Sequence, residues 1–486
     1  MRFLCLFLGV TMHLSASLSL DEKIGQLFIV PAYPLDENAI EEGQPPNNRE
    51  YIEDLVENFH VGGVLFKYYW EIEDQRETVE KLQRLAKTPL FIAQDCEWGV
   101  AMRLENTVAL PKNMALGAIQ DPYTLFQVGQ EIGRQCRIAG VNFALAPVAD
   151  VNSNPLNPVI GMRSFGDDPY RVASCVRKIV MGIQSHGVLA CAKHFPGHGD
   201  TAIDSHKGLP VLDHSLDRLQ KVELLPFQGA INIGVHAIMT GHLLVEEIDD
   251  KRPASLSEKV VQHHLREKMG FPGLVVSDDL MMGALKKIDD LVIRVFKSGS
   301  DLILSAPDVP AGIGAIKRAL HKGIITEQEI DKRVARIRFA KNFIYGRLYE
   351  EEINPTAEKL NIQLYREMVT LVNASKRLHG PYRVVSDFAD ELIEQLALKE
   401  SGQRLVIIRD AQDEAVKWID EDSVVVLLGN PYELKRLPKV PTIVGYDDSL
   451  FAQQAVAEVL NGKLMPAGRL PINPFLECEG LPSLSQ

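Results

Sequence analysis

The sequence predicts an α/β protein: a (β/α)8 barrel of the TIM type, followed by a smaller, sandwich-like α/β domain. Three observations support this. Short apolar runs recur up to residue 306, segments of helical period lie between them, and after about residue 346 the chain is charged and irregular before apolar runs resume. With 46% hydrophobic residues, the 486-residue chain has enough apolar content for two cores.

Eight apolar runs in the first part are predicted to be strands. They are continuously apolar rather than alternating, which is typical of strands buried on both faces of a parallel sheet. A closed barrel is favoured over a doubly wound open sheet, because no glycine-rich phosphate-binding turn follows the first run. The runs are 26–30, 61–66, 89–95, 141–150, 188–195, 235–242, 273–279 and 300–306.

Two helices are marked by their ends. Asp121-Pro122 is a typical helix start and Gly140 a typical helix end. A capping box at 326–329 begins a second helix. The apolar faces are Leu125, Val128, Ile132 and Cys136 in the first helix, and Ile330, Val334, Ile337 and Ile344 in the second.

Changes in the pattern of apolar and charged residues divide the chain into four segments. We expect a signal peptide at 1–17, the barrel at 18–346, a linker with a helix at 347–375, and a short α/β domain at 376–486. Apolar runs at 404–410, 423–430 and 440–448 predict three buried strands in this last domain.

The first 17 residues predict export. Arg2 precedes an apolar stretch, 3–14, and small residues follow at 15–17, as in a secretory signal with its cleavage region. The stretch is too short for an ordinary membrane-spanning helix, so no span is expected after signal removal. We expect a periplasmic or secreted protein, and a cytoplasmic protein with a buried first helix is the alternative.

Charge and cysteine content exclude some classes. The net charge is −13 and no run is rich in Lys or Arg, which argues against a nucleic-acid partner. The five cysteines after the signal are widely spaced and contain no CxxC, so they predict buried small side chains rather than a disulfide framework or zinc site.

Several predicted strands end in polar residues. They are Asp95, Asp150, Lys193-His194, His242 and Asp278-Asp279. The carboxyl ends of barrel strands meet at one mouth, where active sites form, so these side chains are expected to converge.

The densest polar stretch is KHFPGHGDTAIDSHKGLP, residues 193–210. Its Pro and Gly residues predict a loop, which disfavours a metal site built on the His194-x3-His198 spacing. Asp204 lies two residues before His206, so its carboxylate could orient that imidazole as an acid/base. The third interpretation is that the histidines only satisfy local hydrogen bonds.

The run GLVVSDDL, 273–280, brings two adjacent acids to a strand end. Neighbouring side chains on a strand alternate in direction, so one acid can face a pocket while the other has a structural role. Capping of the following helix is the plainer interpretation.

Two arginines are candidates for binding sugar hydroxyls or an anionic group. Arg103 follows Asp95, and Arg163 lies in VIGMRSFGDDP. Each could also be part of a structural ion pair. Trp98 offers a ring for sugar stacking or for packing.

Residues 18–345 resemble glycoside hydrolase family 3, and in particular its bacterial β-N-acetylglucosaminidases. The resemblance rests on SLDEKIGQLFIV (19–30), LAPVADVNSNPLNPVIGMRSFGDDP (145–169), KHFPGHGDTAIDSH (193–206), IMTGHL (238–243) and VVSDDLMMGA (275–284). The loop KHFPGHG…DSH is the most specific of these motifs. It separates the N-acetylglucosaminidases from relatives that take their acid/base from a glutamate elsewhere.

The resemblance implies a retaining β-N-acetylhexosaminidase. Asp278 would be the nucleophile and His206 the acid/base, with Asp204 as its partner. Asp95, Arg103, Arg163, Lys193 and His194 match sugar-binding positions. No cofactor or metal is implied, and the implied substrate is a muropeptide or another glycan that contains N-acetylglucosamine.

The chain departs from the family where DQEGGRV is usual, because it reads DCEWGVA at 95–101. Trp98 there replaces a glycine. The second domain is shorter than the family's fullest version and keeps a recognisable tail, 455–471. The alternatives are a phosphorylase of the same family, a non-catalytic glycan-binding protein, and a metal-dependent hydrolase.

Overall fold

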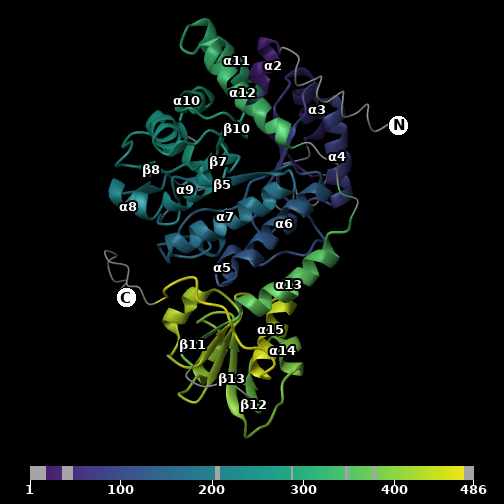
Figure 1. Ribbon diagram of the computed structural model, residues 1–486, viewed down its shortest axis with the longest axis vertical. Coiled ribbons are helices and arrows are strands. Elements are labelled where there is room, and N and C mark those ends of the chain that lie inside the picture. Colours follow the sequence, from purple (N-terminus) through teal and green to yellow (C-terminus); the bar gives the residue numbers. More distant parts are fainter. Residues whose placement is uncertain are drawn as a thin grey trace.

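The computed structural model describes residues 18–34, 48–202, 208–285, 288–344, 349, 351–374, 378 and 380–474. Two large sheets and a small two-stranded one form the described part of the molecule, and helices lie around the large sheets (Figure 1). The signal peptide predicted at 1–17 lies outside the described residues.

The larger sheet is an eight-stranded parallel barrel, as predicted. Its order is β10-β1-β2-β3-β4-β5-β7-β9. A parallel bridge between Val276 and Leu302 joins the two end strands and closes the ring. The strands are β1 (Phe28–Ala32), β2 (Gly63–Phe66), β3 (Phe91–Gln94), β4 (Phe143–Ala144), β5 (Leu189–Phe195), β7 (Ala237–Thr240), β9 (Leu274–Ser277) and β10 (Ile303–Leu304).

The strands are continuously apolar because both of their faces are buried. Every residue of β2, β3, β5, β7 and β9 is buried between the barrel interior and the surrounding helices. The main surrounding helices are α2 (Leu20–Gly25), α3 (Arg49–Asn58), α4 (Ile72–Leu85), α6 (Pro122–Ala139), α7 (Pro169–Ser185), α8 (Leu216–Lys221), α9 (Leu225–Asn232), η4 (Lys259–Lys268), α10 (Leu291–Ser298), α11 (Val309–His321) and α12 (Glu327–Phe343).

Both helices predicted from their ends are present. Asp121 caps α6 by accepting a hydrogen bond from the Tyr123 amide, and Gly140 ends it with φ 80°, a conformation that favours glycine. Thr326 and Glu329 form the predicted capping box of α12. The predicted apolar faces of both helices are buried.

Short elements complete the barrel. β6 (Val211–Leu212) and β8 (Leu244–Val245) pair as a small ribbon. The short helices of this part are η1 (Val100–Met102), α5 (Asn113–Leu116), η2 (Gly161–Arg163), η3 (Ala254–Leu256) and η5 (Gly283–Leu285). Four of the cysteines, Cys96, Cys136, Cys175 and Cys191, are free and buried, as predicted.

The second sheet has five strands in the order β11-β15-β14-β13-β12. Its three central strands are the predicted ones, β13 (Gln403–Ile408), β14 (Val424–Leu427) and β15 (Thr442–Val444). The edge strands β11 (Thr370–Val372) and β12 (Tyr382–Val385) were not predicted, and β11 lies in the range expected to be a linker. Both are short and partly exposed, so neither leaves a continuous apolar run.

Helices connect and cover the second sheet. Helix α13 (Asn354–Met368) runs from the barrel to this sheet (Figure 1) and packs against α5 and α6. The remaining elements are α14 (Asp390–Glu394), η6 (Glu414–Trp418), η7 (Pro431–Arg436) and α15 (Leu450–Leu460). No helix in the described part of the chain is long and apolar enough to cross a membrane.

Lys341 on α12 is fully buried at the amino-terminal end of the barrel. Its Nζ donates to Gln26 Oε1 at 2.7 Å and lies 4.9 Å from the centre of the Phe91 ring. Burial lowers the pKa of this lysine to about 7. Between that pH and its ordinary value of about 10.5, the unfolded chain holds a proton that the folded chain lacks, so stability should rise with pH in this window.

Lys341→Met is therefore expected to raise the free energy of unfolding at pH 6 by roughly 2 kcal/mol or more. The gain should shrink between pH 7 and pH 10, because the wild-type penalty decreases there. Denaturant unfolding at pH 6, 8 and 9.5 measures this, with exposed Lys332→Met on the same helix as the control. A gain that does not change with pH would contradict the assignment.

Candidate active site

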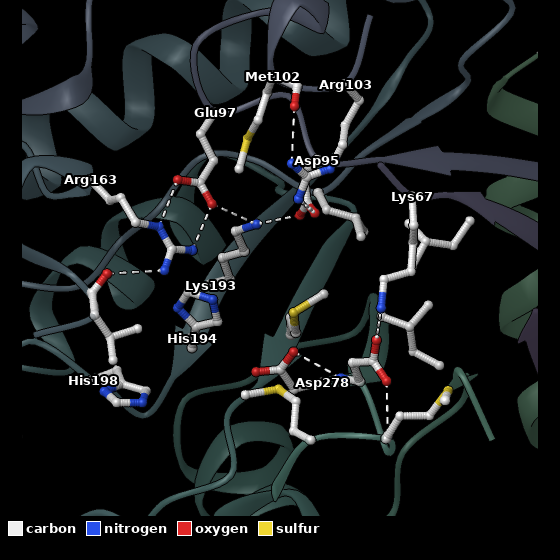
Figure 2. A pocket seen from close by; sticks show the side chains of 18 of the residues that line it. Lys67, Asp95, Glu97, Met102, Arg103, Arg163, Lys193, His194, His198 and Asp278 are labelled. Atoms are coloured by element: carbon white, nitrogen blue, oxygen red, sulfur yellow. Dashed lines mark hydrogen bonds and ion pairs between the residues drawn. The ribbon is translucent and has the colours of Figure 1, made fainter. Parts of the chain in front are cut away.

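The carboxyl ends of the barrel strands surround a cavity of about 550 Å³. Polar residues predicted at three strand ends lie in it together: Asp95 after β3, Lys193 and His194 in β5, and Asp278 after β9 (Figure 2). They meet there because parallel barrel strands all end at the same mouth. Arg103 and Arg163 also line the cavity.

Lys193 lies between two acids on the cavity wall (Figure 2). Its Nζ is 2.9 Å from Asp95 Oδ1 and 2.9 Å from Glu97 Oε1. Arg103 Nη2 donates to the other oxygen of Asp95 at 2.7 Å. Asp95 is thus held by two cations, and its position is fixed before any ligand arrives.

Glu97 was not predicted as a site residue. Its carboxylate accepts two hydrogen bonds from the Arg163 guanidinium: Oε2 accepts from Nε at 2.9 Å, and Oε1 accepts from Nη2 at 2.7 Å. Asp95 and Glu97 are two residues apart, so in extended chain they face the same side. That spacing was the available signal. Arg103 and Arg163 are thus each paired with a carboxylate, Asp95 and Glu97, which fits both the binding clamp and the structural ion pair expected from the sequence.

These pairs hold all five groups in their charged forms. Burial raises the pKa of Asp95, but Lys193 and Arg103 outweigh it and keep that pKa far below its usual value. In the same way Arg163 and Lys193 overcome burial and lower the pKa of Glu97 to about 2. Burial lowers the pKa of Lys193, and the two acids reverse this and raise it.

Asp278 points into the cavity from the end of β9 (Figure 2). Its Oδ1 accepts the amide of Asp279 at 2.8 Å. Burial raises its pKa, but the imidazoles of His242 and His194, that amide and Lys193 together lower it. The carboxylate is therefore ionised at neutral pH, and it can attack an electrophilic carbon or stabilise a developing cation.

The adjacent Asp279 is used differently. Its Oδ2 is 2.6 Å from Lys67 Nζ, and its Oδ1 accepts the amide of Met281. Its carbonyl oxygen is 3.0 Å from His242 Nε2. These contacts fix the backbone that carries Asp278.

His194 is oriented from behind by Asp150. Its Nδ1 is 2.8 Å from Asp150 Oδ2, so its Nε2 remains for the cavity. The other oxygen of Asp150 accepts the amides of His194 at 3.1 Å and His198 at 2.7 Å. These contacts with Asp150 give His194 and His198 a role in shaping the wall.

Asp204 and His206, the predicted acid/base pair, lie outside the described residues. Of the described residues just before that segment, His198 lines the cavity. Trp98 also lines the cavity, and Lys112 Nζ is 5.8 Å from the centre of its ring.

One cluster of described residues has metal-ligand atoms. Oxygens or nitrogens of Asp200, His214 and Glu223 lie within 4.8 Å of one another. Arg218 Nη2 is 3.0 Å from Glu223 and 3.7 Å from Asp200. A guanidinium therefore already faces both carboxylates.

The fold and the site define an α/β-barrel protein with an ionised acid and a ring of paired charges in its mouth, which is where barrel enzymes act. The chain belongs to glycosyl hydrolase family 3, because residues 19–339 match the family model "Glycosyl hydrolase family 3 N terminal domain".

Relatives of known name are similar over much of the chain. A "Beta-N-acetylglucosaminidase/beta-glucosidase" of Cellulomonas fimi is 31% identical over 66% of this chain and 57% of its own. "Beta-hexosaminidase A" of Pseudoalteromonas piscicida is 31% identical over 59% of this chain and 54% of its own. The chain thus spans little more than half the length of these two relatives.

One solved structure resembles this chain over nearly the whole length of both proteins. It is a glycoside hydrolase family 3 β-N-acetylglucosaminidase from Paenibacillus sp. str. FPU-7, 28% identical, with a TM-score of 0.79. The match covers 94% of this chain and 99% of that one, so it includes both the barrel and the second sheet.

Proposed function

We propose that this protein is a retaining β-N-acetylhexosaminidase that releases N-acetylglucosamine from the end of a glycan. The names of the relatives and the match to the Paenibacillus enzyme support the reaction class. The observation that carries the proposal is the position of Asp278. Its carboxylate is ionised and lies at the end of β9, in a cavity large enough for a sugar. The same cavity is lined by Asp95, which is held by two cations, and by His194.

The proposed reaction has two steps. In the first, an oxygen of Asp278 attacks the anomeric carbon, and the glycosidic bond breaks with its electron pair on the leaving oxygen. Protonated His206 gives that oxygen its proton, which leaves a glycosyl ester on Asp278 and a neutral imidazole. Asp204 orients the imidazole throughout.

In the second step, neutral His206 takes a proton from water while the water oxygen attacks the same carbon. The ester bond breaks, its electrons return to Asp278, and His206 is protonated again. Two inversions give retention of the β configuration. Asp95, Arg103, Arg163, Lys193 and His194 would bind the hydroxyl and acetamido groups, because they present fixed donors and acceptors along the wall.

The proposed natural substrate is a muropeptide or related glycan with a β-linked N-acetylglucosamine. The signal-like sequence of residues 1–17 supports a reaction in the periplasm or outside the cell, with the cytoplasm as the alternative. No cofactor is part of the proposal, so chelators should leave the rate unchanged.

A panel of chromogenic β-glycosides tests the function. We expect cleavage of the N-acetylglucosaminide to exceed that of the glucoside and galactoside, with free β-N-acetylglucosamine as the first product by NMR. Folded protein that cleaves no N-acetylhexosaminide would contradict the proposal. Formation of a sugar 1-phosphate in phosphate buffer would instead identify the phosphorylase alternative, because phosphate would have replaced water in the second step.

A further inference from the structure

Tyr432 of the second domain reaches a loop of the barrel. This loop, residues 145–168, follows β4 and is called the β4 loop below. Tyr432 lies on η7, and its hydroxyl donates to the backbone oxygen of Asn152 at 3.1 Å. The same hydroxyl oxygen accepts from Asn152 Nδ2 at 2.8 Å. Because Asn152 is fully buried, water cannot supply these hydrogen bonds, and the Tyr432 hydroxyl supplies them instead.

Asn152 in turn holds both sides of Arg163. Its side-chain Oδ1 accepts a hydrogen bond from the backbone amide of Gly161 at 3.0 Å, and its backbone amide donates to the carbonyl oxygen of Gly166 at 2.9 Å. Arg163 lies between these two anchored points and pairs with Glu97 in the cavity wall. The position of that guanidinium thus depends on the shape that Asn152 gives to the β4 loop.

The β4 loop also contacts the chain just before the predicted acid/base segment. Asn157 Nδ2 donates to the carbonyl of His198 at 2.8 Å. A Cβ on Gly199 would lie 1.8 Å from the carbonyl oxygen of Val151, so only glycine allows this close approach. Movement of the β4 loop would therefore also disturb residues 198–199.

A second contact from the C-terminal domain anchors the far end of the β4 loop. The amide of Asp167 donates to Pro471 at 3.2 Å, and the amide of Asn473 donates to Asp167 Oδ2 at 2.6 Å. The domain thus holds this loop at residue 152 and at residue 167, on both sides of Arg163.

We infer that Tyr432 is a positioning residue: through Asn152 it keeps Arg163 in place for sugar binding, so the second domain is required for full substrate affinity. This inference rests on the proposed function. Without the hydroxyl, the buried carbonyl oxygen of Asn152 loses its donor, and Asn152 Nδ2 keeps only its longer bond of 3.3 Å to the carbonyl oxygen of Asn154. Other conformations of the β4 loop then become populated. A smaller fraction of the protein then has the loop conformation that binds substrate, so KM should rise more than kcat falls.

The test compares two full-length variants that each remove one tyrosine hydroxyl. Tyr432→Phe removes the contact with the barrel. Tyr446→Phe is the matched control, because its buried hydroxyl is 2.8 Å from Thr370 Oγ1, inside the second domain. With an N-acetylglucosaminide, KM should rise about 5-fold or more in Tyr432→Phe, with kcat within about 3-fold of wild type. Tyr446→Phe should keep the wild-type KM.

The Arg163→Ala background isolates the mechanism. Adding Tyr432→Phe to it should have little further effect on KM, because the residue being positioned is gone. An unchanged KM in Tyr432→Phe, an equal rise in Tyr446→Phe, or a full effect that persists without Arg163 would each overturn the inference.

Hydrogen exchange gives a readout that needs no substrate. Peptides covering residues 152–166 should exchange faster in Tyr432→Phe than in Tyr446→Phe or wild type. Unchanged exchange would overturn the inference even if the wild-type protein cleaved no glycoside. Failure of the wild type on the glycoside panel would count against the proposed function alone.

Discussion

Asp278→Asn is expected to lower kcat for an N-acetylglucosaminide by at least about 10³-fold, the scale of loss seen when a nucleophile is removed. The amide has the same shape as the carboxylate but is too weak a nucleophile to form the glycosyl ester. Steady-state assays with a chromogenic substrate measure the loss. A 2-fluoro glycoside should label wild type on the peptide that contains Asp278, and should leave the variant unlabelled.

The control for this change is Asp217→Asn, which alters an exposed carboxylate on α8. It should keep wild-type activity and labelling. If Asp278→Asn retained more than a few per cent of wild-type kcat, or if the label appeared on another residue, Asp278 would not be the nucleophile.

His206→Ala is expected to slow turnover by about 10²-fold or more on substrates with poor leaving groups. Without an acid, the leaving oxygen must depart as an anion, so activated aryl glycosides should suffer less in the first step. Water is not activated in the second step, and added azide should restore turnover as the glycosyl azide. The basic limb of the wild-type kcat/KM profile, which reports loss of the proton that His206 donates in the first step, should disappear, and the acid limb set by Asp278 should remain.

His263→Ala serves as the comparison, because it removes an exposed histidine on η4. It should leave rates and pH profile unchanged. Near-normal turnover of a poor substrate by His206→Ala, or no response to azide, would remove His206 from the acid/base role.

Most of the barrel could be predicted because its rules are local. The strands β2, β3, β5, β7 and β9 are buried on both faces, which makes each a continuous apolar run. Helix α6 carries its own boundaries in Asp121-Pro122 and Gly140. The edge strands β11 and β12 have no such signal, because part of each faces solvent and only pairing with a neighbour defines it.

The candidate site was predictable where a residue lies at a strand end. Asp95, Lys193, His194 and Asp278 meet because barrel topology brings strand ends together. Glu97 was missed, since its importance comes from Arg163, 66 positions away. The bond between Asn152 and Tyr432 joins residues 280 positions apart, and no local pattern in the chain indicates it.

The described residues that line the cavity include four acids and four bases: Asp95, Glu97, Asp278 and Asp279 against Lys67, Arg103, Arg163 and Lys193. The lining is therefore close to electroneutral in a chain of net charge −13. A wall with balanced charges attracts a distant ion only weakly. At short range its paired charges still provide many hydrogen-bond donors and acceptors for an uncharged sugar ring. Affinity for a neutral monosaccharide should consequently change little when salt is added, unlike the behaviour of a pocket that captures its ligand by charge.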